Sequence, residues 1–235
     1  DHGCDWSSDV CSSDLIAVFG TPGSGKSFGI LEVANSIASN IITKLSFNLS
    51  QLRTPLDLAK IFHKVSDIAL EGKIPLVFFD EFDSVIEGKL GWLKYFLAPM
   101  QDGVFREGDS MHPIVKAIFV FAGGTSSTFK EFCGENLKNE EEQKQFSLQF
   151  KSAKGPDFIS RLRGYVNILG PNQTDDKRDQ LFIIRRAMLL RSLLERKVPH
   201  LINDNGETQI DNGVLRALLK IPRYKHESKI GRAHV

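Results

Sequence analysis

Apolar and polar positions follow two different periods along the chain. Five short apolar runs, each bounded by glycine or polar residues, are typical of buried strands. Between them lie longer segments in which apolar residues recur every three or four positions, which is typical of amphipathic helices. The predicted strands are residues 16–19, 41–47, 76–79, 117–122 and 164–169, and the predicted helices include residues 27–39, 56–70 and 90–100. Strands that alternate with helices predict an α/β fold with a mostly parallel five-stranded sheet between helices.

After the last predicted strand the helical spacing continues without further strand-like runs. Residues 174–175 can cap a long helix that reaches about Arg196, and Asp211 can cap a second helix. We therefore expect an α/β core over residues 16–171, followed by a small and incomplete helical lid over residues 172–228.

The two ends of the sequence are expected to be foreign to the protein. Residues 9–15 can be encoded by a DNA string whose reverse complement encodes residues 229–235. That string resembles a short-read sequencing adapter, and residues 1–8 can be read as its continuation. We therefore expect residues 1–15 and 229–235 to be translated adapter that forms no integral part of the fold, and the gene to be cut at both ends.

Composition places the chain among ordinary globular proteins. Of its 235 residues, 41% are hydrophobic and 25% are charged. The net charge of +1 argues against nucleic acid as a partner, and no apolar run approaches the roughly 18 residues that cross a membrane. Three cysteines, Cys4, Cys11 and Cys133, are too few for a disulfide framework and lack zinc-site spacing, and such sparse use favours a cytoplasmic location.

A phosphate-binding motif follows the first predicted strand directly. Residues 20–27, GTPGSGKS, match the pattern G-x-x-x-x-G-K-[ST] between a strand and a helix. Glycines let successive N–H groups turn toward a phosphate, and the helix N-terminus adds partial positive charge. Lys26 is expected to reach the phosphates of ATP, and Ser27 to bind Mg²⁺. The expected nucleotide-binding residues are Gly20, Thr21, Pro22, Gly23, Ser24, Gly25, Lys26, Ser27 and Phe28.

Two acids end the strand predicted at residues 76–79, within LVFFDEFDS. In a parallel sheet this strand delivers Asp80 and Glu81 to the edge at which the phosphate loop begins. Asp80 is expected to complete the Mg²⁺ shell, and Glu81 to orient and deprotonate the attacking water. The alternative is that a strand-end acid caps the next helix, which suits Asp83 better than Asp80.

With these two motifs the chain resembles the AAA+ ATPases. Residues 155–164, GPDFISRLRG, are similar to a segment of the bacterial Clp/HslU branch. The resemblance implies that Arg161 is an arginine finger, which contacts the γ-phosphate held by a neighbouring subunit of a homo-oligomeric ring. A planar and permanently charged guanidinium suits that task. Arg163 is the fallback, and an ordinary surface ion pair is the alternative for Arg161.

The resemblance also assigns a role to the residues after the strand predicted at 117–122. It implies that Thr125 is the sensor-1 residue, which forms a hydrogen bond with the attacking water or the γ-phosphate. The alternative is that Thr125, Ser126 or Ser127 is the N-cap of the next helix.

Together these features predict an ATPase that binds ATP with Mg²⁺, hydrolyses it, and couples hydrolysis to the remodelling of an unidentified protein client. The alternative is a nucleotide-gated switch or scaffold without threading activity. Residues 47–73 favour that alternative, because they lack the aromatic–hydrophobic–glycine pore loop of Clp-type unfoldases.

Overall fold

The computed structural model describes residues 13–38, 40–54, 56–84, 90–174, 179–203 and 205–224, without the side chain of Arg196. The contacts between these residues divide the chain into two compact units. The first unit contains the described residues up to Phe19 and Ser27–Asn167, and the second contains Gly20–Lys26 and the described residues from Ile168 on. The predicted boundary between residues 171 and 172 stays a prediction, since the division by contacts falls after Asn167.

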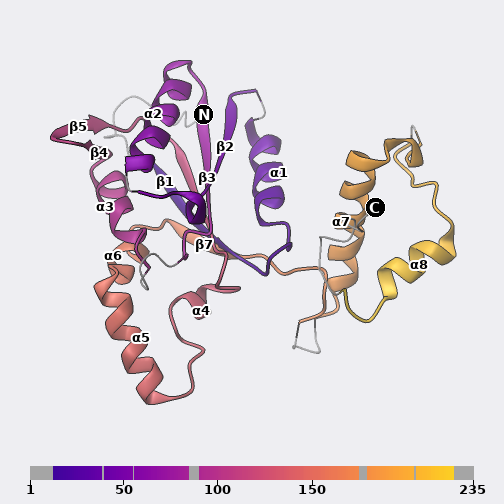
Figure 1. Ribbon diagram of the computed structural model, residues 1–235. Helices are drawn as coiled ribbons and strands as arrows, with labels where there is room; N and C mark the ends of the chain where they lie inside the picture. The colour runs from indigo at the N-terminus through magenta and orange to yellow at the C-terminus, as the bar shows by residue number, and fades with distance from the viewer. Residues whose placement is uncertain are drawn as a thin grey trace, which may run out of the picture. The chain divides into compact units, whose positions relative to one another are not determined.

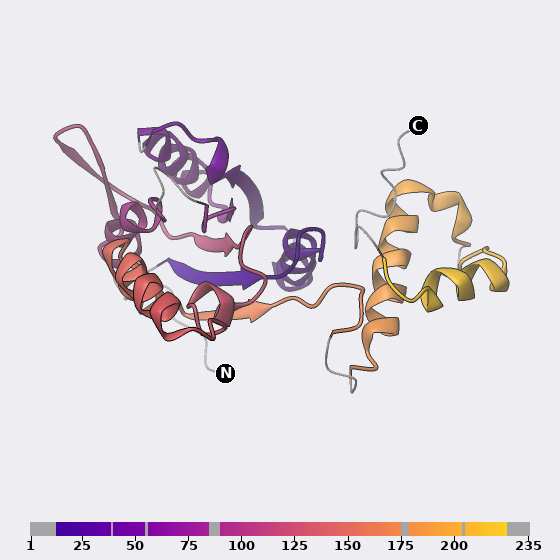
Figure 2. The ribbon, with the colours of Figure 1, turned by 60° about the horizontal axis from the view of Figure 1, so that its bottom comes forward.

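A five-stranded parallel sheet forms the centre of the first unit. The strands are β1 (Asp14–Phe19), β2 (Ile42–Asn48), β3 (Ile74–Asp80), β6 (Ile118–Ala122) and β7 (Gly164–Asn167). They lie in the order β2-β3-β6-β1-β7, and every neighbouring pair is parallel. The strands point the same way in Figure 2. The predicted α/β fold with a mostly parallel five-stranded sheet is thereby confirmed.

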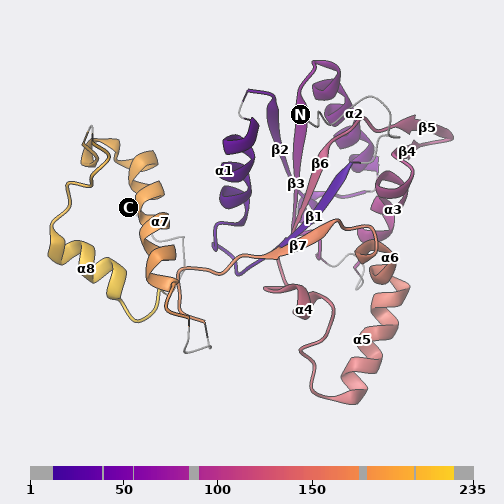
Figure 3. The ribbon, with the colours of Figure 1, turned by 180° about the vertical axis from the view of Figure 1, so that it is seen from behind.

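Helices cover both faces of this sheet. Figures 1 and 3 show α1 (Lys26–Ala38) on one side of the strands, and α2 (Leu56–Leu70) and α3 (Leu93–Gln101) on the other. Three further helices connect β6 to β7, namely α4 (Phe129–Phe132), α5 (Glu140–Ser152) and α6 (Gly155–Ile159). The stretch after α3 forms a separate antiparallel hairpin of β4 (Val104–Glu107) and β5 (Ser110–Pro113).

Phenylalanine rings fill the space between the sheet and the helices α2, α3 and α6. Because strand side chains alternate between faces, Phe79 of β3 and Phe121 of β6 point to the same side as Phe19 of β1. The rings of Phe79 and Phe121 stack with centroids 5.5 Å apart. The fully buried rings are Phe19, Phe62, Phe78, Phe79, Phe82, Phe96, Phe119, Phe121 and Phe158.

The first strand begins earlier than the sequence predicted. β1 starts at Asp14 rather than Ile16, and Leu15 is buried and pairs with Phe119 of β6. The expectation that residues 13–15 form no integral part of the fold is therefore wrong, because Leu15 continues the alternation that buries the inward side chains of β1. Residues 1–12 and 229–235 lie outside the described residues, so their adapter origin stays a prediction.

The second unit contains the helices α7 (Phe182–Lys197) and α8 (Asn212–Lys220), with a short 3-10 turn at Pro199–Leu201 between them. The side chain of Asp211 accepts hydrogen bonds from two amides of the first turn of α8, which confirms its predicted capping role. The predicted cap at Thr174 is wrong, because α7 begins only at Phe182, and residue 175 lies outside the described residues. In the described part of the chain, no helix combines the length and the apolar character needed to cross a membrane.

Candidate active site

The strands of the sheet end in one row. Asp80, the last residue of β3, pairs with Ala122, the last residue of β6. Ala122 pairs in turn with Val18 of β1, which is followed by Phe19 and then by the glycine-rich loop. The acid-bearing end of β3 and the loop-bearing end of β1 therefore lie at the same edge of the sheet, with β6 between them.

The glycine-rich loop has the backbone expected of a phosphate loop. Gly23 and Gly25 have φ angles of 85° and 89°, which glycine adopts at little cost. The Lys26 ammonium folds back on the loop and donates hydrogen bonds to the carbonyl oxygens of Gly20, at 2.6 Å, and Thr21, at 3.4 Å. The buried Oγ of Ser24 has no hydrogen-bond partner among the described residues. A cation, an uncommitted hydroxyl and a tight glycine turn together fit a phosphate group.

Asp80 presents carboxylate oxygens at the end of β3. It is partly exposed, and the hydroxyl of Ser46 donates to its Oδ2 at 3.4 Å. A hydroxyl and a carboxylate, such as those of Ser27 and Asp80, are ligands that Mg²⁺ prefers alongside phosphate oxygens and water. In the described residues, no three or more His, Cys, Asp or Glu side chains gather in a way that could hold a metal on their own. A Mg²⁺ ion brought in with a nucleotide needs only one or two protein ligands.

Glu81 has a strained backbone and a close neighbour. Its φ angle of 57° lies in the left-handed region, which costs a residue with a side chain on the order of 1 kcal/mol. Gly124, in the turn after β6, lies directly against it, because a Cβ atom at Gly124 would be only 2.6 Å from Cγ of Glu81. Glycine at position 124 therefore allows the two turns to approach each other at Glu81.

Asp83 joins the same two turns by hydrogen bonds. Its side chain is only 1% exposed, and its carboxylate accepts N–H bonds from Gly124 at 2.7 Å, Thr125 at 3.1 Å and Ser126 at 2.8 Å. The alternative that Asp83 caps the next helix is not what the structure describes, since its partners lie in the turn after β6. Sequence reasoning missed this link, because the partners are about forty residues away in the sequence.

Thr125 lies in this turn and is exposed. Its hydroxyl donates a hydrogen bond to Oδ2 of Asp83 at 2.7 Å. The alternative that Thr125, Ser126 or Ser127 caps the next helix is wrong, because Thr128 is the N-cap of α4 and accepts the N–H of Glu131 at 3.1 Å. The sensor-1 role of Thr125 stays a prediction, and the hydrogen bond to Asp83 fixes which way its hydroxyl proton points.

Arg161 follows α6 and makes hydrogen bonds to uncharged groups. Its Nη1 donates to the carbonyl oxygen of Asp157 at 2.5 Å, and its Nη2 donates to the side-chain oxygen of Gln101 at the end of α3. Arg163, by contrast, is exposed and forms an ion pair with Asp14 at 3.6 Å. The ordinary surface ion pair considered for Arg161 is therefore found at Arg163.

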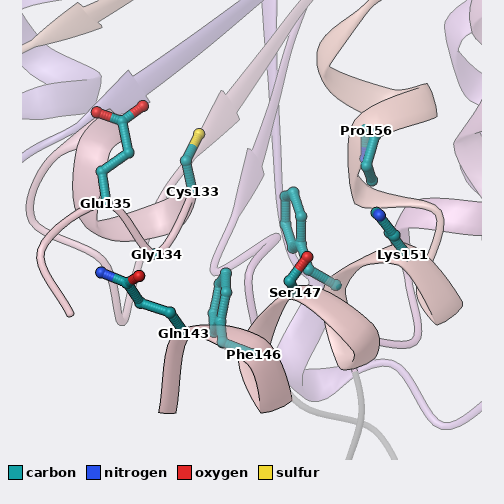
Figure 4. A pocket seen from close by; sticks show the side chains of 9 residues that line it. Cys133, Gly134, Glu135, Gln143, Phe146, Ser147, Lys151 and Pro156 are labelled. Atoms are coloured by element: carbon teal, nitrogen blue, oxygen red, sulfur yellow. The ribbon is translucent and has the colours of Figure 1, made fainter. Parts of the chain in front are cut away.

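A pocket of about 380 Å³ lies elsewhere in the first unit, among the end of α4, α5 and α6. Figure 4 shows Cys133 and Glu135 on one side and Gln143, Phe146 and Ser147 of α5 on the other. Burial raises the pKa of the Cys133 thiol to about 11, so the thiol stays protonated at neutral pH. A protonated thiol is a poor nucleophile, which agrees with a structural role for this cysteine.

Comparison with known families identifies the part of the chain that carries these motifs. The model of the ATPase family associated with various cellular activities (AAA) matches residues 16–104. The matched segment includes the glycine-rich loop, Asp80 and Glu81. No curated protein matches the chain. Residues 16–104 are therefore similar to the ATPase domain of that family, and the match, the parallel sheet and the acids at its edge support ATP hydrolysis as the activity.

Proposed function

We propose that this chain is the ATP-hydrolysing module of a homo-oligomeric assembly that couples hydrolysis to the remodelling of a protein partner. The observation that carries the proposal is the arrangement at the end of β3. There a strained Glu81 is packed against Gly124, next to an acid with oxygen ligands for a metal. Strained backbone at a strand end is often found at functional sites.

Each proposed site residue has one task. The backbone amides of residues 20–27 and the ammonium of Lys26 hold the phosphates of ATP. Ser27 and Asp80 hold Mg²⁺, which neutralises charge on the β- and γ-phosphate oxygens when it is bound. Glu81 accepts a proton from the attacking water, and Thr125 contacts the same water.

Arg161 is proposed to act on the nucleotide of a neighbouring copy. Its guanidinium is held by two uncharged oxygens, so its positive charge is not neutralised by those partners. An arginine that stabilises the charge of the transition state can raise a hydrolysis rate by about 10³- to 10⁵-fold.

We further propose that the chain belongs to the bacterial Clp/HslU branch of the AAA+ ATPases. The similarity of residues 155–164 to the corresponding segment of that branch supports this assignment. Sparse cysteines support a cytoplasmic location.

Two substitutions separate nucleotide binding from hydrolysis. We expect Glu81→Gln in the intact protein to bind ATP with nearly unchanged affinity and to lower kcat by about 10²- to 10⁴-fold, because the amide cannot accept the proton. Lys26→Ala should instead abolish ATP binding, since it removes a cation from the phosphate loop. Fluorescent ATP-analogue titration and phosphate-release assays measure both quantities.

The outcomes are distinct. A normal turnover rate in Glu81→Gln would contradict the role of Glu81 as the base.

Arg161→Ala should lower the turnover of the assembled protein, whereas the matched Arg163→Ala variant should change it little. Equal effects of these two variants would contradict the finger role of Arg161. Turnover that is unchanged by candidate protein partners would argue for the nucleotide-gated switch instead of remodelling.

A further inference from the structure

The turn after β3 is anchored by Phe82, the residue between Glu81 and Asp83. Phe82 is completely buried, with its ring stacked on Phe158 at 5.6 Å and edge-on to Phe121 at 5.7 Å. The turn is closed by a hydrogen bond from the amide of Ser84 to the carbonyl oxygen of Glu81, at 2.9 Å. A buried ring in the middle of a closed turn fixes the backbone positions from which Glu81 and Asp83 extend.

Asp83 takes up the donors that the turn after β6 presents. An ionised carboxylate only accepts hydrogen bonds, and here it faces three consecutive backbone N–H groups and one hydroxyl. Three successive N–H groups that converge on one anion form a concave binding site of the kind that also holds phosphates. In this chain Asp83 fills that site, and the turn at Gly124–Ser126 is thereby fixed in position.

These contacts surround Glu81 on two sides. Phe82 fixes the turn that carries Glu81, and Asp83 holds Gly124, against which the side chain of Glu81 is packed. We propose that Asp83 is a positioning residue for ATP hydrolysis, which keeps Glu81 and Thr125 in one fixed arrangement. This inference rests on the proposed role of Glu81 as the base.

The hydrogen bond from Thr125 to Asp83 has a consequence for the water. Because the only hydroxyl proton of Thr125 is donated to Asp83, Thr125 can only accept a hydrogen bond from the water. A water that donates one proton to Glu81 and the other to Thr125 keeps a lone pair for attack on phosphorus. The proton then passes to Glu81 as the new P–O bond forms and the bond to the leaving phosphate oxygen breaks.

Asp83→Asn tests the positioning role, because asparagine has nearly the same size but carries an NH₂ group. In either orientation of the amide, this NH₂ faces an N–H or O–H donor of Gly124–Ser126. We expect kcat to fall by roughly 10- to 100-fold, with the dissociation constant for ATP changed by less than about threefold, because Asp83 is not among the residues proposed to hold the nucleotide. Circular dichroism controls for folding.

The coupling is measured by combining this change with Glu81→Gln. If Asp83 acts through Glu81, the second substitution lowers the residual rate of Glu81→Gln by less than about threefold, and the two effects are not additive. A reduced rate in Glu81→Gln with a fully additive loss in the double variant would overturn the inference and leave the base role intact. A normal rate in Glu81→Gln alone would overturn the base role, and the inference with it.

Two further variants keep the test independent of a folding defect in Asp83→Asn. Gly124→Ala leaves Asp83 intact but forces a Cβ atom against Glu81, so it should lower kcat with little change in ATP affinity. Thr125→Ser keeps the hydroxyl and should retain most activity, whereas Thr125→Val should lose it. Full activity in both Gly124→Ala and Thr125→Val would overturn the proposal.

Discussion

In the first unit, buried phenylalanine rings hold the sheet and its helices together. In the second unit, Arg185 and Arg186 of α7 donate hydrogen bonds to backbone carbonyl oxygens of neighbouring segments. The ring of Phe121, for example, lies within 6 Å of four other rings, Phe79, Phe82, Phe96 and Phe158. Arg186 of α7, only 2% exposed, donates hydrogen bonds to the carbonyl oxygens of Pro171, Leu219 and Ile221.

The difference shows which side chains each unit depends on. In the first unit the aromatic core fixes the position of the turn that carries Glu81 and Asp83. Phe82, which lies between these two acids in the sequence, is buried in that core. Among the described residues of α7 and α8, Leu194 is the only hydrophobic residue that is buried, and large apolar side chains such as Met188 and Val214 are exposed. The order of the second unit therefore depends more on directional hydrogen bonds to carbonyl groups, which a single substitution can remove.

Phe121→Ala should have the largest effect on stability, because it removes a ring at the centre of the aromatic core. We expect it to lower the free energy of unfolding of the first unit by about 3–5 kcal/mol. Urea denaturation followed by circular dichroism measures the loss. Leu148→Ala on the exposed face of α5 is the matched control and should cost less than about 0.5 kcal/mol. Equal losses would contradict the role given to the aromatic core.

Arg186→Met should have a smaller effect, confined to the second unit. Methionine replaces the apolar stem but leaves the carbonyl oxygens of Leu219 and Ile221 without their donor. We expect a loss of about 1–3 kcal/mol, seen as faster hydrogen exchange in α7 and α8 with unchanged exchange in β3 and β6. The control is Arg191→Met, which removes only an exposed ion pair with Glu195. Faster exchange across β3 and β6 as well would show that the two units do not depend on separate interactions.

A pH-dependent loss should be the smallest effect. The guanidinium of Arg185 binds both carboxylate oxygens of Asp179, at 2.8 and 2.6 Å, and lowers the pKa of Asp179 well below its ordinary value. A lowered pKa means that this pair stabilises the folded state fully above pH ~4 and loses its contribution as the pH falls toward the folded pKa.

Asp179→Asn provides the reference for this prediction. The stability difference between the parent protein and Asp179→Asn, measured by hydrogen exchange in α7, should be constant from pH 5 to pH 7 and shrink below about pH 4. A difference that grew as the pH fell would contradict the ion pair.

Much of the fold could be predicted from the sequence because the relevant signals are local. The apolar run before Asp80 and the glycine loop after Phe19 each lie within a few residues of the strand end that they mark. Parallel pairing then places those ends at one edge, whatever the details of the helices. The same logic predicted the cap of α8 at Asp211, since a helix cap is also a local interaction.

Contacts between distant segments could not be predicted in this way. The carboxylate of Asp83 finds its partners only after β3 and β6 have paired, and Arg186 finds its carbonyl partners only after α7 and α8 have packed. The sequence predicts the start of β1 two residues too late, at Ile16, because the adapter-like pattern extends over Leu15, which belongs to the inward-facing series of β1. A nucleotide sequence pattern carries no information about which residues pack.

Mixing two inactive variants tests the central claim most directly, namely that Glu81 of one chain and Arg161 of a neighbouring chain act on the same ATP. Glu81→Gln retains Arg161, and Arg161→Ala retains Glu81, so a mixed assembly contains some complete sites. We predict that the phosphate-release rate of an equimolar mixture rises well above the rate of either variant alone, toward about a quarter of the parent rate if the chains mix at random. A mixture that stays at the average of the two separate rates, although the chains exchange, would contradict the shared site.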